Sequence, residues 1–248
     1  LTGLTNRLRQ NGWDFSPDST KILMLTHKVL AEEQGYSGIA GVFSSHNDAF
    51  TKKEDPHIEF FVDTLEPMCK AYEERRYGDM FQVIGDSVPT IQSRSDKLRW
   101  SKDMAELLEL RKTGTIGDVL DHLRRTKRPR LPERVEKRED DLAQISSDLE
   151  PEQSYLSRLR KLREIPYQQV SILEQFLNNH SPFSTKHGVK GAEFENVLVV
   201  IGRGWNHYNF NQMLEWAGEG VPPDKITTYE RNRNLFYVAC SRPKRHLA

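Results

Sequence analysis

Short apolar runs near both ends of the chain predict buried strands. The run from Lys21 to Thr26 (KILMLT) and the run from Asn196 to Ile201 (NVLVVI) are largely hydrophobic and are flanked by polar residues. Strands of a parallel sheet that is covered on both faces have this pattern. A third apolar run, from Ile39 to Phe43, follows a helical stretch from Val29 to Gln34. We therefore predict a strand-helix-strand unit in the first part of the chain.

Between these runs, hydrophobic residues recur at three- and four-residue spacing, which is typical of amphipathic helices. The first such stretch extends from Ile58 to Tyr72 and contains Pro67, a candidate kink. Further stripes follow at Met104–Leu108, Ile116–Leu123, Leu142–Leu149, Tyr155–Leu162 and Val170–Leu177. No strand pattern interrupts them. We predict a largely helical subdomain over residues 52–180, inserted into an α/β domain that is formed by residues 1–51 and 181–248.

The ends of the chain add shorter elements to this picture. Residues 1–12 carry leucines at helical spacing and predict a surface helix. Residues 202–220 are polar and aromatic and predict a loop before the last helix. The final residues, 245–248, are typical of the beginning of a further strand, so we expect the sequence to be a piece of a longer protein.

Composition restricts the classes of function. The chain has 36 basic and 36 acidic residues, so it lacks the overall positive charge of a protein that coats nucleic acid. No apolar run approaches the roughly 20 residues that span a bilayer, and we expect no signal peptide. Cys69 and Cys240 lie in apolar helical contexts and indicate buried thiols in a reducing compartment. We expect a cytoplasmic location without a membrane role.

One basic run is a candidate for contact with phosphates. Residues 124–130 (RRTKRPR) are followed by the acidic residues Glu139, Asp140 and Asp141. A patch that follows a nucleic-acid backbone is one interpretation. A solvated loop whose charges largely cancel is the favoured one. No His or Cys spacing suits zinc.

The segment 184–200 (STKHGVKGAEFENVLVV) places polar residues where a strand ends. Thr185 and His187 follow an extended run, and Gly188 and Gly191 allow a tight turn before the next strand. Ligands of open α/β sheets lie beyond strand ends, so this arrangement suits a phosphate or sugar site. A plain strand-turn-strand with a polar loop remains the alternative. Thr26–Lys28 ends another strand, where a histidine is more often a helix cap or surface group.

A second segment, 234–247 (NLFYVACSRPKRHL), has an apolar helical run that delivers Ser241 and Arg242 before a basic turn. We expect Tyr237 to pack, because it lies on the apolar helix. As the alternative to a functional role, Arg242 would be a surface residue that closes the C-terminus of the helix.

Together the two segments resemble motifs V and VI of the UvrD/Rep-type superfamily 1 DNA helicases. All fixed positions of the pattern T-x-H-x-x-K-G-x-E-F are met, by Thr185, His187, Lys190, Gly191, Glu193 and Phe194. The pattern L-x-Y-V-A-x-[ST]-R-A is matched by Leu235, Tyr237, Val238, Ala239, Ser241 and Arg242. Pro243 stands where the family usually has Ala, which leaves the geometry just after the arginine open. The resemblance in this specific form covers about thirty residues.

The resemblance implies a RecA-like fold of the P-loop NTPase type, with a parallel sheet domain that is interrupted by a helical insertion. In the family, two such domains bind ATP between them, and this chain would be the second. Arg242 would then reach the γ-phosphate as an arginine finger. Glu193 would accept a hydrogen bond from the ribose, and Gly191 would allow the backbone to approach the nucleotide closely. As an alternative, Glu193 is an exposed loop carboxylate.

The resemblance also implies partners. Thr185 and His187 would hold the backbone of single-stranded DNA, and Lys190 would contact phosphate or brace the turn. An N-terminal RecA-like domain of the same polypeptide would complete the ATP site and bind most of the Mg²⁺, because this sequence has no G-x-x-x-x-G-K-[ST] loop. We expect the chain alone not to hydrolyse ATP. The implied whole is a 3′-to-5′ DNA helicase. A helicase-nuclease subunit and a non-catalytic nucleic-acid-binding or partner module are the alternatives.

Overall fold

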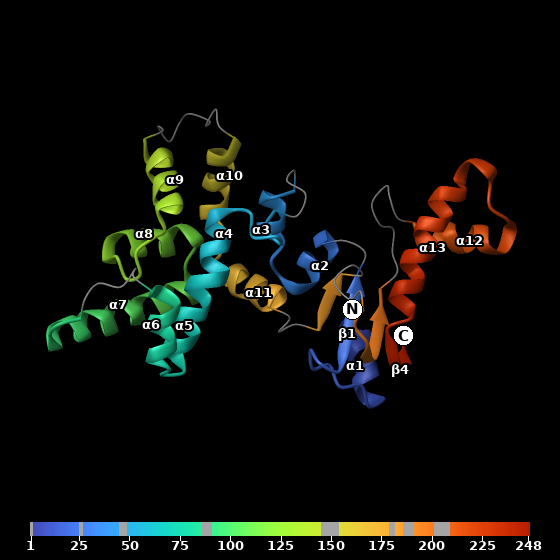
Figure 1. The fold of residues 1–248 in the computed structure, drawn as a ribbon, viewed down its shortest axis with the longest axis horizontal. Helices are drawn as coiled ribbons and strands as arrows, with labels where there is room; N and C mark the ends of the chain where they lie inside the picture. The colour runs from blue at the N-terminus through green and yellow to red at the C-terminus, as the bar shows by residue number, and fades with distance from the viewer. Residues whose placement is uncertain are drawn as a thin grey trace. The chain divides into compact units, whose positions relative to one another are not determined.

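The computed structural model describes residues 2–24, 27–44, 49–85, 91–144, 154–178, 182–185, 191–200 and 209–248. The chain forms two compact units (Figure 1). An α/β unit contains residues 1–35 and 175–248, and a helical unit contains residues 36–174. The division therefore falls after residues 35 and 174, whereas the sequence pattern placed it after residues 51 and 180.

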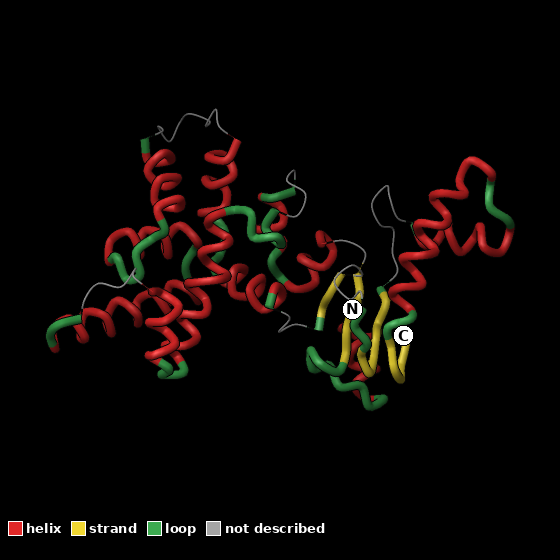
Figure 2. Tube along the Cα trace, viewed as in Figure 1, coloured by secondary structure: helices red, strands yellow, loops and turns green. Residues whose placement is uncertain are grey.

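A four-stranded parallel sheet forms the centre of the α/β unit (Figure 2). Its strands are β1 (Thr20–Met24), β2 (Phe183–Thr185), β3 (Phe194–Val199) and β4 (Pro243–Leu247). They lie side by side in the order β2-β1-β3-β4, and each neighbouring pair is parallel. β1 and β3 confirm the strands that the two apolar runs predicted, and β4 confirms a strand at the end of the chain.

Helices complete the α/β unit. They are α1 (Thr2–Gln10), α2 (His27–Gln34), α12 (Phe210–Glu219), the 3₁₀ turn η3 (Pro223–Lys225) and α13 (Ile226–Cys240). Leu23 of β1, Val197 of β3 and Ala239 of α13 form one buried cluster, so the end of α13 packs on the sheet. A second cluster, Phe210, Met213 and Leu235, joins α12 to α13.

The loop predicted over residues 202–220 is wrong from residue 210 onward, where α12 forms. The side chain of Asn209 accepts a hydrogen bond from the backbone N–H of Gln212 (3.1 Å) and caps the helix. Phe210 and Met213 are three residues apart and pack against α13. The capping residue and this spacing were readable in the sequence, but the polar composition of the segment masked them. Residues 202–208 of the expected loop lie outside the described residues.

Helices form the second unit. They are α3 (Ser37–Val42), α4 (Pro56–Phe60), the π-helix η1 (Phe61–Leu65), α5 (Glu66–Glu73), α6 (Tyr77–Ile84), α7 (Arg94–Thr113), α8 (Ile116–Thr126), α9 (Glu133–Ala143) and α10 (Ser154–Arg163). Most of α11 (Gln168–Leu177) also belongs to this unit. Within the described part of residues 36–174, the only β-pairing is an isolated bridge between Thr115 and Pro166. The helical character that the sequence predicted for this region is confirmed.

The strand predicted over Ile39–Phe43 is wrong, because these residues lie in and just after α3. A short apolar run fits a buried strand and a buried helix equally well, and here Ile39 and Phe43 are both buried four residues apart. The side-chain oxygen of Gln169 accepts hydrogen bonds from the backbone N–H groups of Gly38 (2.9 Å) and Ile39 (3.2 Å). A residue 130 positions away thus satisfies the first turn of α3 and places the segment in the helical unit.

The stretch around Pro67 forms one helical run with an irregular turn. α4, η1 and α5 follow each other without a break from Pro56 to Glu73. Proline has no backbone N–H to donate and its ring clashes with the carbonyl four residues before it. The π-helical turn Phe61–Leu65 precedes Pro67 and accommodates this mismatch.

A buried charge network joins α4, α9 and α10. His57 is 1% exposed and lies between Glu139 (Nε2 to Oε1, 3.1 Å) and Asp55 (Nδ1 to Oδ1, 3.7 Å). Arg138 donates to Asp55 (2.9 Å), and Arg163 binds Glu139. Burial alone would lower the pKa of His57, but the two carboxylates outweigh it and raise this pKa. Burial raises the pKa of Asp55, but His57 and Arg138 reverse this and lower it to about 2.

Candidate functional site

The parallel sheet separates the predicted site residues between its two edges. Gly191 and Glu193 come directly before β3, and Arg242 comes directly before β4. Thr185 is the last residue of β2, where it pairs with Met24 of β1. Because all four strands run in one direction, strand beginnings meet at one edge and strand ends at the other. Gly191, Glu193 and Arg242 therefore share one edge, and Thr185 lies at the opposite edge.

A backbone hydrogen bond joins the two motifs at the edge where the strands begin. The N–H of Phe194 donates to the carbonyl oxygen of Arg242 (3.0 Å). The next residue, Pro243, is the ladder partner of Phe194. Pro243 is thus the first residue of β4, a position that tolerates proline. The departure from the usual alanine leaves the strand after the arginine intact.

Arg242 lies just beyond the last turn of α13. Its Nε donates to the carbonyl oxygen of Val238 (3.1 Å), and the side chain is half-buried. The last carbonyls of a helix carry partial negative charge, so they hold a cation in place. Within the described ranges, the terminal guanidinium nitrogens have no hydrogen-bond or ion-pair partner. The side chain is thus anchored through one of its three guanidinium nitrogens.

Glu193 and Gly191 lie on the exposed segment that leads into β3. Glu193 is exposed, so its carboxylate is accessible to a ligand. Gly191 has a φ of +79°, which L-residues rarely adopt, and a Cβ at this position would meet no atom within 4 Å. The glycine is therefore required by the backbone conformation and not by close packing within the chain.

The residues predicted to bind DNA are described only in part. Thr185 is placed by the backbone of β2. His187 and Lys190 lie outside the described residues. Of the segment Thr26–Lys28, Thr26 also lies outside them, and His27 is the first residue of α2.

Tyr237 does not pack as predicted. Its side chain is 69% exposed, whereas Leu235 and Ala239 of the same helix are buried. The alternation follows from the helical period, because residues 235 and 239 share the face toward the core and residue 237 points away. The prediction that Tyr237 packs because it lies on an apolar helix is therefore wrong.

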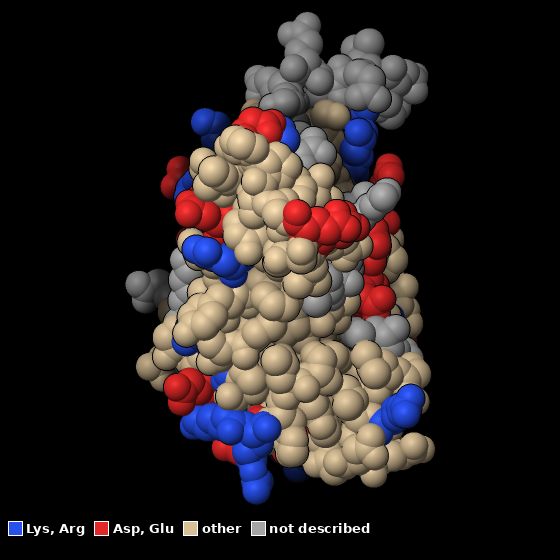
Figure 3. Space-filling model, turned by 90° about the vertical axis from the view of Figure 1, so that its right-hand side faces the viewer, with Lys and Arg blue, Asp and Glu red and all other residues tan. Residues whose placement is uncertain are grey.

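The basic run 124–130 forms ion pairs with acidic residues of the helical unit. The pairs are Arg124 with Asp140, Arg125 with Glu106, Lys127 with Glu136 and Arg128 with Asp103. Four of its five basic residues are thus neutralised, as the favoured interpretation predicted. Figure 3 shows a different face, on the side formed by α12 and α13, where basic and acidic side chains surround a wide uncharged area.

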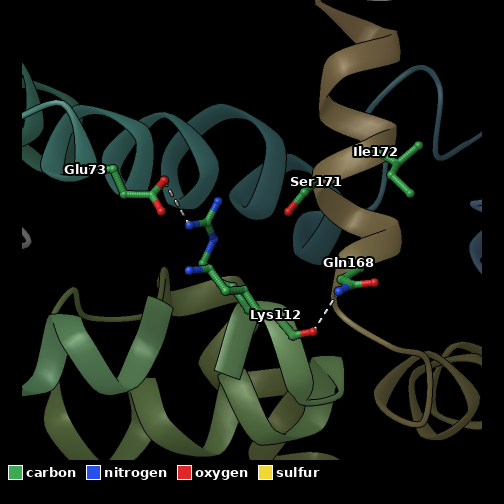
Figure 4. A pocket seen from close by; sticks show the side chains of 6 residues that line it. Glu73, Lys112, Gln168, Ser171 and Ile172 are labelled. Carbon is green, nitrogen blue, oxygen red and sulfur yellow. Dashed lines mark hydrogen bonds and ion pairs between the residues drawn. The ribbon is translucent and has the colours of Figure 1, made fainter. Parts of the chain in front are cut away.

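A cavity of about 370 Å³ lies in the helical unit between α5, α7 and α11 (Figure 4). Its charged wall is Arg111, which binds both carboxylate oxygens of the buried Glu66 (2.9 and 2.6 Å) and lies 3.6 Å from Glu73. The guanidinium is therefore already compensated, and none of the predicted site residues lines this cavity. In the described residues, no group of three or more His, Cys, Asp or Glu side chains is placed to hold a metal ion.

Sequence reasoning missed Lys21, which is 6% exposed on β1 with its Nζ 5.5 Å from the ring centre of Phe194. It also missed the buried hydrogen bond from the amide of Asn196 to Thr20 (3.1 Å), which links β3 to β1. A lysine inside an otherwise apolar strand is a readable signal, but its contact joins residues far apart in the chain.

Among the described residues, no helix is both long and apolar enough to cross a membrane.

Comparison with known proteins identifies the family. The family described as UvrD-like helicase C-terminal domain matches residues 23–248. Gabija protein GajB of Bacillus cereus (strain HuB5-5) is 28% identical over 97 residues, which cover 36% of this chain. The alignment spans only 14% of the length of GajB. No solved structure matches the chain at a significant level.

Proposed function

The chain belongs to the UvrD-like helicase C-terminal domain family, and on this premise we propose that it is the C-terminal motor part of an ATP-dependent DNA helicase. Its α/β unit would be the second RecA-like domain. The observation that carries the proposal is the backbone hydrogen bond between Phe194 and Arg242. It brings Glu193 and Arg242, from two motifs about fifty residues apart, to the edge of the sheet where the strands begin, and not to the strand ends that the sequence pattern indicated.

In this proposal, Arg242 stabilises charge during phosphoryl transfer. Bound ATP supplies the phosphoryl group, whose equatorial oxygens carry most of the negative charge in the transition state. The guanidinium is always protonated and offers a planar pair of donors. Since Nε is held by the carbonyl of Val238, the two terminal nitrogens are pre-oriented and need little reorganisation when the charge develops.

Glu193 and Gly191 would bind the nucleotide sugar. A carboxylate accepts hydrogen bonds from two neighbouring hydroxyl groups, and the exposed Glu193 is free to do so at this edge. The positive φ of Gly191 turns the chain into β3 and leaves space beside its Cα for a ligand. These contacts hold substrate and transition state alike, so they would act on binding more than on the rate of chemistry.

Thr185, at the opposite edge, would contact single-stranded DNA together with His187 and Lys190, which lie outside the described residues. Short polar and basic side chains position a phosphate backbone without reading its sequence. β1 pairs with β2 on one side and with β3 on the other. A movement of these strands when DNA binds at one edge would therefore be transmitted to the nucleotide edge. An N-terminal RecA-like domain would supply the phosphate loop and the Mg²⁺ ligands that this sequence lacks.

The test is ATP turnover and strand separation by the full-length protein. Steady-state phosphate release should rise at least tenfold on addition of single-stranded DNA, and a duplex with a 3′ tail should be unwound faster than one with a 5′ tail. The 248-residue chain alone should release phosphate no faster than buffer. Turnover by this chain alone, or a full-length protein whose ATP turnover ignores DNA, would contradict the proposal.

A further inference from the structure

Lys21 occupies an unusual place for a lysine. It lies on β1, the strand between β2 and β3, and only 6% of the residue is exposed. Lysine is almost never this buried without compensation. Its Nζ lies 5.5 Å from the centre of the Phe194 ring, within the range of a cation–π contact. Desolvation lowers the pKa of Lys21, and the charge of Asp18 partly opposes this effect.

Phe194 in turn sits at an irregular point of the sheet. The ladder between β3 and β4 shifts its register between Phe194 and Asn196. Such irregularities redirect a side chain and are common next to active sites. Phe194 packs against the buried cluster of Leu23, Val197 and Ala239, whose members come from β1, β3 and the end of α13.

Phe194 is therefore connected to both candidate nucleotide contacts. Glu193 directly precedes it in the chain, and its N–H holds the carbonyl of Arg242. Phe194 also packs against the cluster that includes Ala239, near the end of the helix from which Arg242 extends. The ammonium group of Lys21 lies over its ring. A change at Lys21 would thus reach both residues through a single aromatic side chain.

We propose that Lys21 is a positioning residue for the nucleotide edge. By holding the ring of Phe194, Lys21 fixes the irregular beginning of β3. Through the hydrogen bond from Phe194 to Arg242, it also fixes the position of the Arg242 backbone after α13. This inference rests on the proposed function, because it assigns Lys21 a role in the reaction that Arg242 would assist. Catalytic groups displaced by about 1 Å lose up to about 100-fold in rate.

The test compares Lys21→Met with Lys21→Arg in the full-length protein. Methionine keeps the length and apolar stem of lysine but removes the charge, whereas arginine keeps a cation over the ring. Lys21→Met should lower kcat for DNA-stimulated ATP turnover about tenfold, with the KM for ATP changed less than about threefold. Lys21→Arg should keep kcat within about threefold of the wild type. Lys244→Met, which removes an exposed lysine of β4, is the matched control and should keep kcat.

A double-variant cycle shows whether Lys21 acts through Phe194. If it does, Lys21→Met combined with Phe194→Leu should lose no more kcat than Phe194→Leu alone. A double variant whose loss is the product of the two single losses would overturn the inference. So would equal losses in Lys21→Met and Lys21→Arg, because these would indicate packing volume and not charge.

Failure of this inference differs from failure of the proposed function. If Arg242→Lys abolishes turnover while Lys21→Met turns over normally, the positioning role is wrong and the function stands. If Arg242→Lys keeps its kcat, the proposed function fails, and the inference is overturned with it because no catalytic arginine is left to position.

Discussion

The N–H of Phe194 donates a 3.0 Å hydrogen bond to the carbonyl oxygen of Arg242, and this contact joins two segments about fifty residues apart. It forms because β3 and β4 are parallel neighbours and both begin at the same edge of the sheet. Each segment alone is a loop that leads into a strand. Side by side, they bring an exposed carboxylate and an anchored guanidinium to the same edge of the sheet.

Glu193 is expected to govern nucleotide affinity. We predict that Glu193→Ala in the full-length protein raises the KM for ATP about tenfold or more, because a hydrogen bond to a charged group contributes about 1.5–3 kcal/mol. The kcat should stay within about threefold, since the ribose is bound equally in the ground and transition states. Glu195→Ala is the control, because Glu195 is also exposed. Its carboxylate oxygen lies 3.9 Å from Nε of Arg245, another exposed residue, so its loss should not change the KM. An unchanged KM in Glu193→Ala would remove the ribose role.

Thr185 and His187 are expected to report DNA occupancy to the nucleotide edge. We predict that the double change Thr185→Ala with His187→Ala lowers DNA-stimulated ATP turnover about tenfold and leaves basal turnover within about twofold. Phosphate release with and without single-stranded DNA measures both rates. Thr227→Ala, at an exposed position of α13, should change neither. Equal loss of the basal and stimulated rates would indicate a structural lesion instead.

The basic run 124–130 is not expected to bind DNA, because its charges are used within the helical unit. We predict that Arg124→Gln with Lys127→Gln changes the Kd for single-stranded DNA less than about twofold at each salt concentration. If both residues contacted phosphates, the slope of log K against log salt would fall by about 1.4 in magnitude. Fluorescence anisotropy titrations over a salt series distinguish these outcomes.

The network around His57 gives the helical unit a pH-dependent stability. The pKa of His57 is raised in the folded chain, so its contribution is fully present below its unfolded value of about 6.5 and is lost as the pH rises through the raised value. The pKa of Asp55 is lowered to about 2, so its contribution, about 2 kcal/mol, is present above about pH 4 and is lost as the pH falls toward 2.

Urea unfolding of the chain from pH 3 to pH 10 measures the free energy of unfolding as a function of pH. The curve has an acid limb, where stability is lost as the pH falls, and an alkaline limb, where it is lost as the pH rises. We predict that His57→Gln lowers the free energy of unfolding at pH 6 and flattens the alkaline limb, because glutamine does not titrate. Arg138→Gln should instead weaken the acid limb, since Arg138 helps to lower the pKa of Asp55. An alkaline limb of unchanged slope in His57→Gln would show that other groups cause it.

Much of the fold follows from local patterns in the sequence. The apolar runs around Leu23 and Val197 predicted the two central strands, and the three- and four-residue periodicity predicted the helical unit. The run at Ile39 was misread because its length fits either element, and the N–H groups that decide it are bound by the distant Gln169. Tyr237 was predicted to pack because its helix is rich in apolar residues. The helical period instead places Leu235 and Ala239 on the buried face and Tyr237 on the exposed one.

The candidate site was predictable in identity but not in arrangement. Glu193 and Arg242 could be named from their motifs, yet their common edge depends on the parallel pairing of β3 with β4. Lys21 could not be found by motif, since its contact with Phe194 joins positions more than 170 residues apart. Long-range pairing of this kind is set by the packing of the whole sheet, which a local pattern does not contain.

The central claim is that Arg242 stabilises the transition state, and the kcat of Arg242→Lys in the full-length protein tests it most directly. Lysine keeps the charge but loses the planar fork and the anchored Nε. We predict a KM for ATP within a few-fold of normal and a kcat lowered about 10³-fold, the lower end of the effect of an arginine finger. Arg245→Lys, at an exposed position of β4, is the control and should turn over normally. A raised KM with an intact kcat in Arg242→Lys would contradict the account.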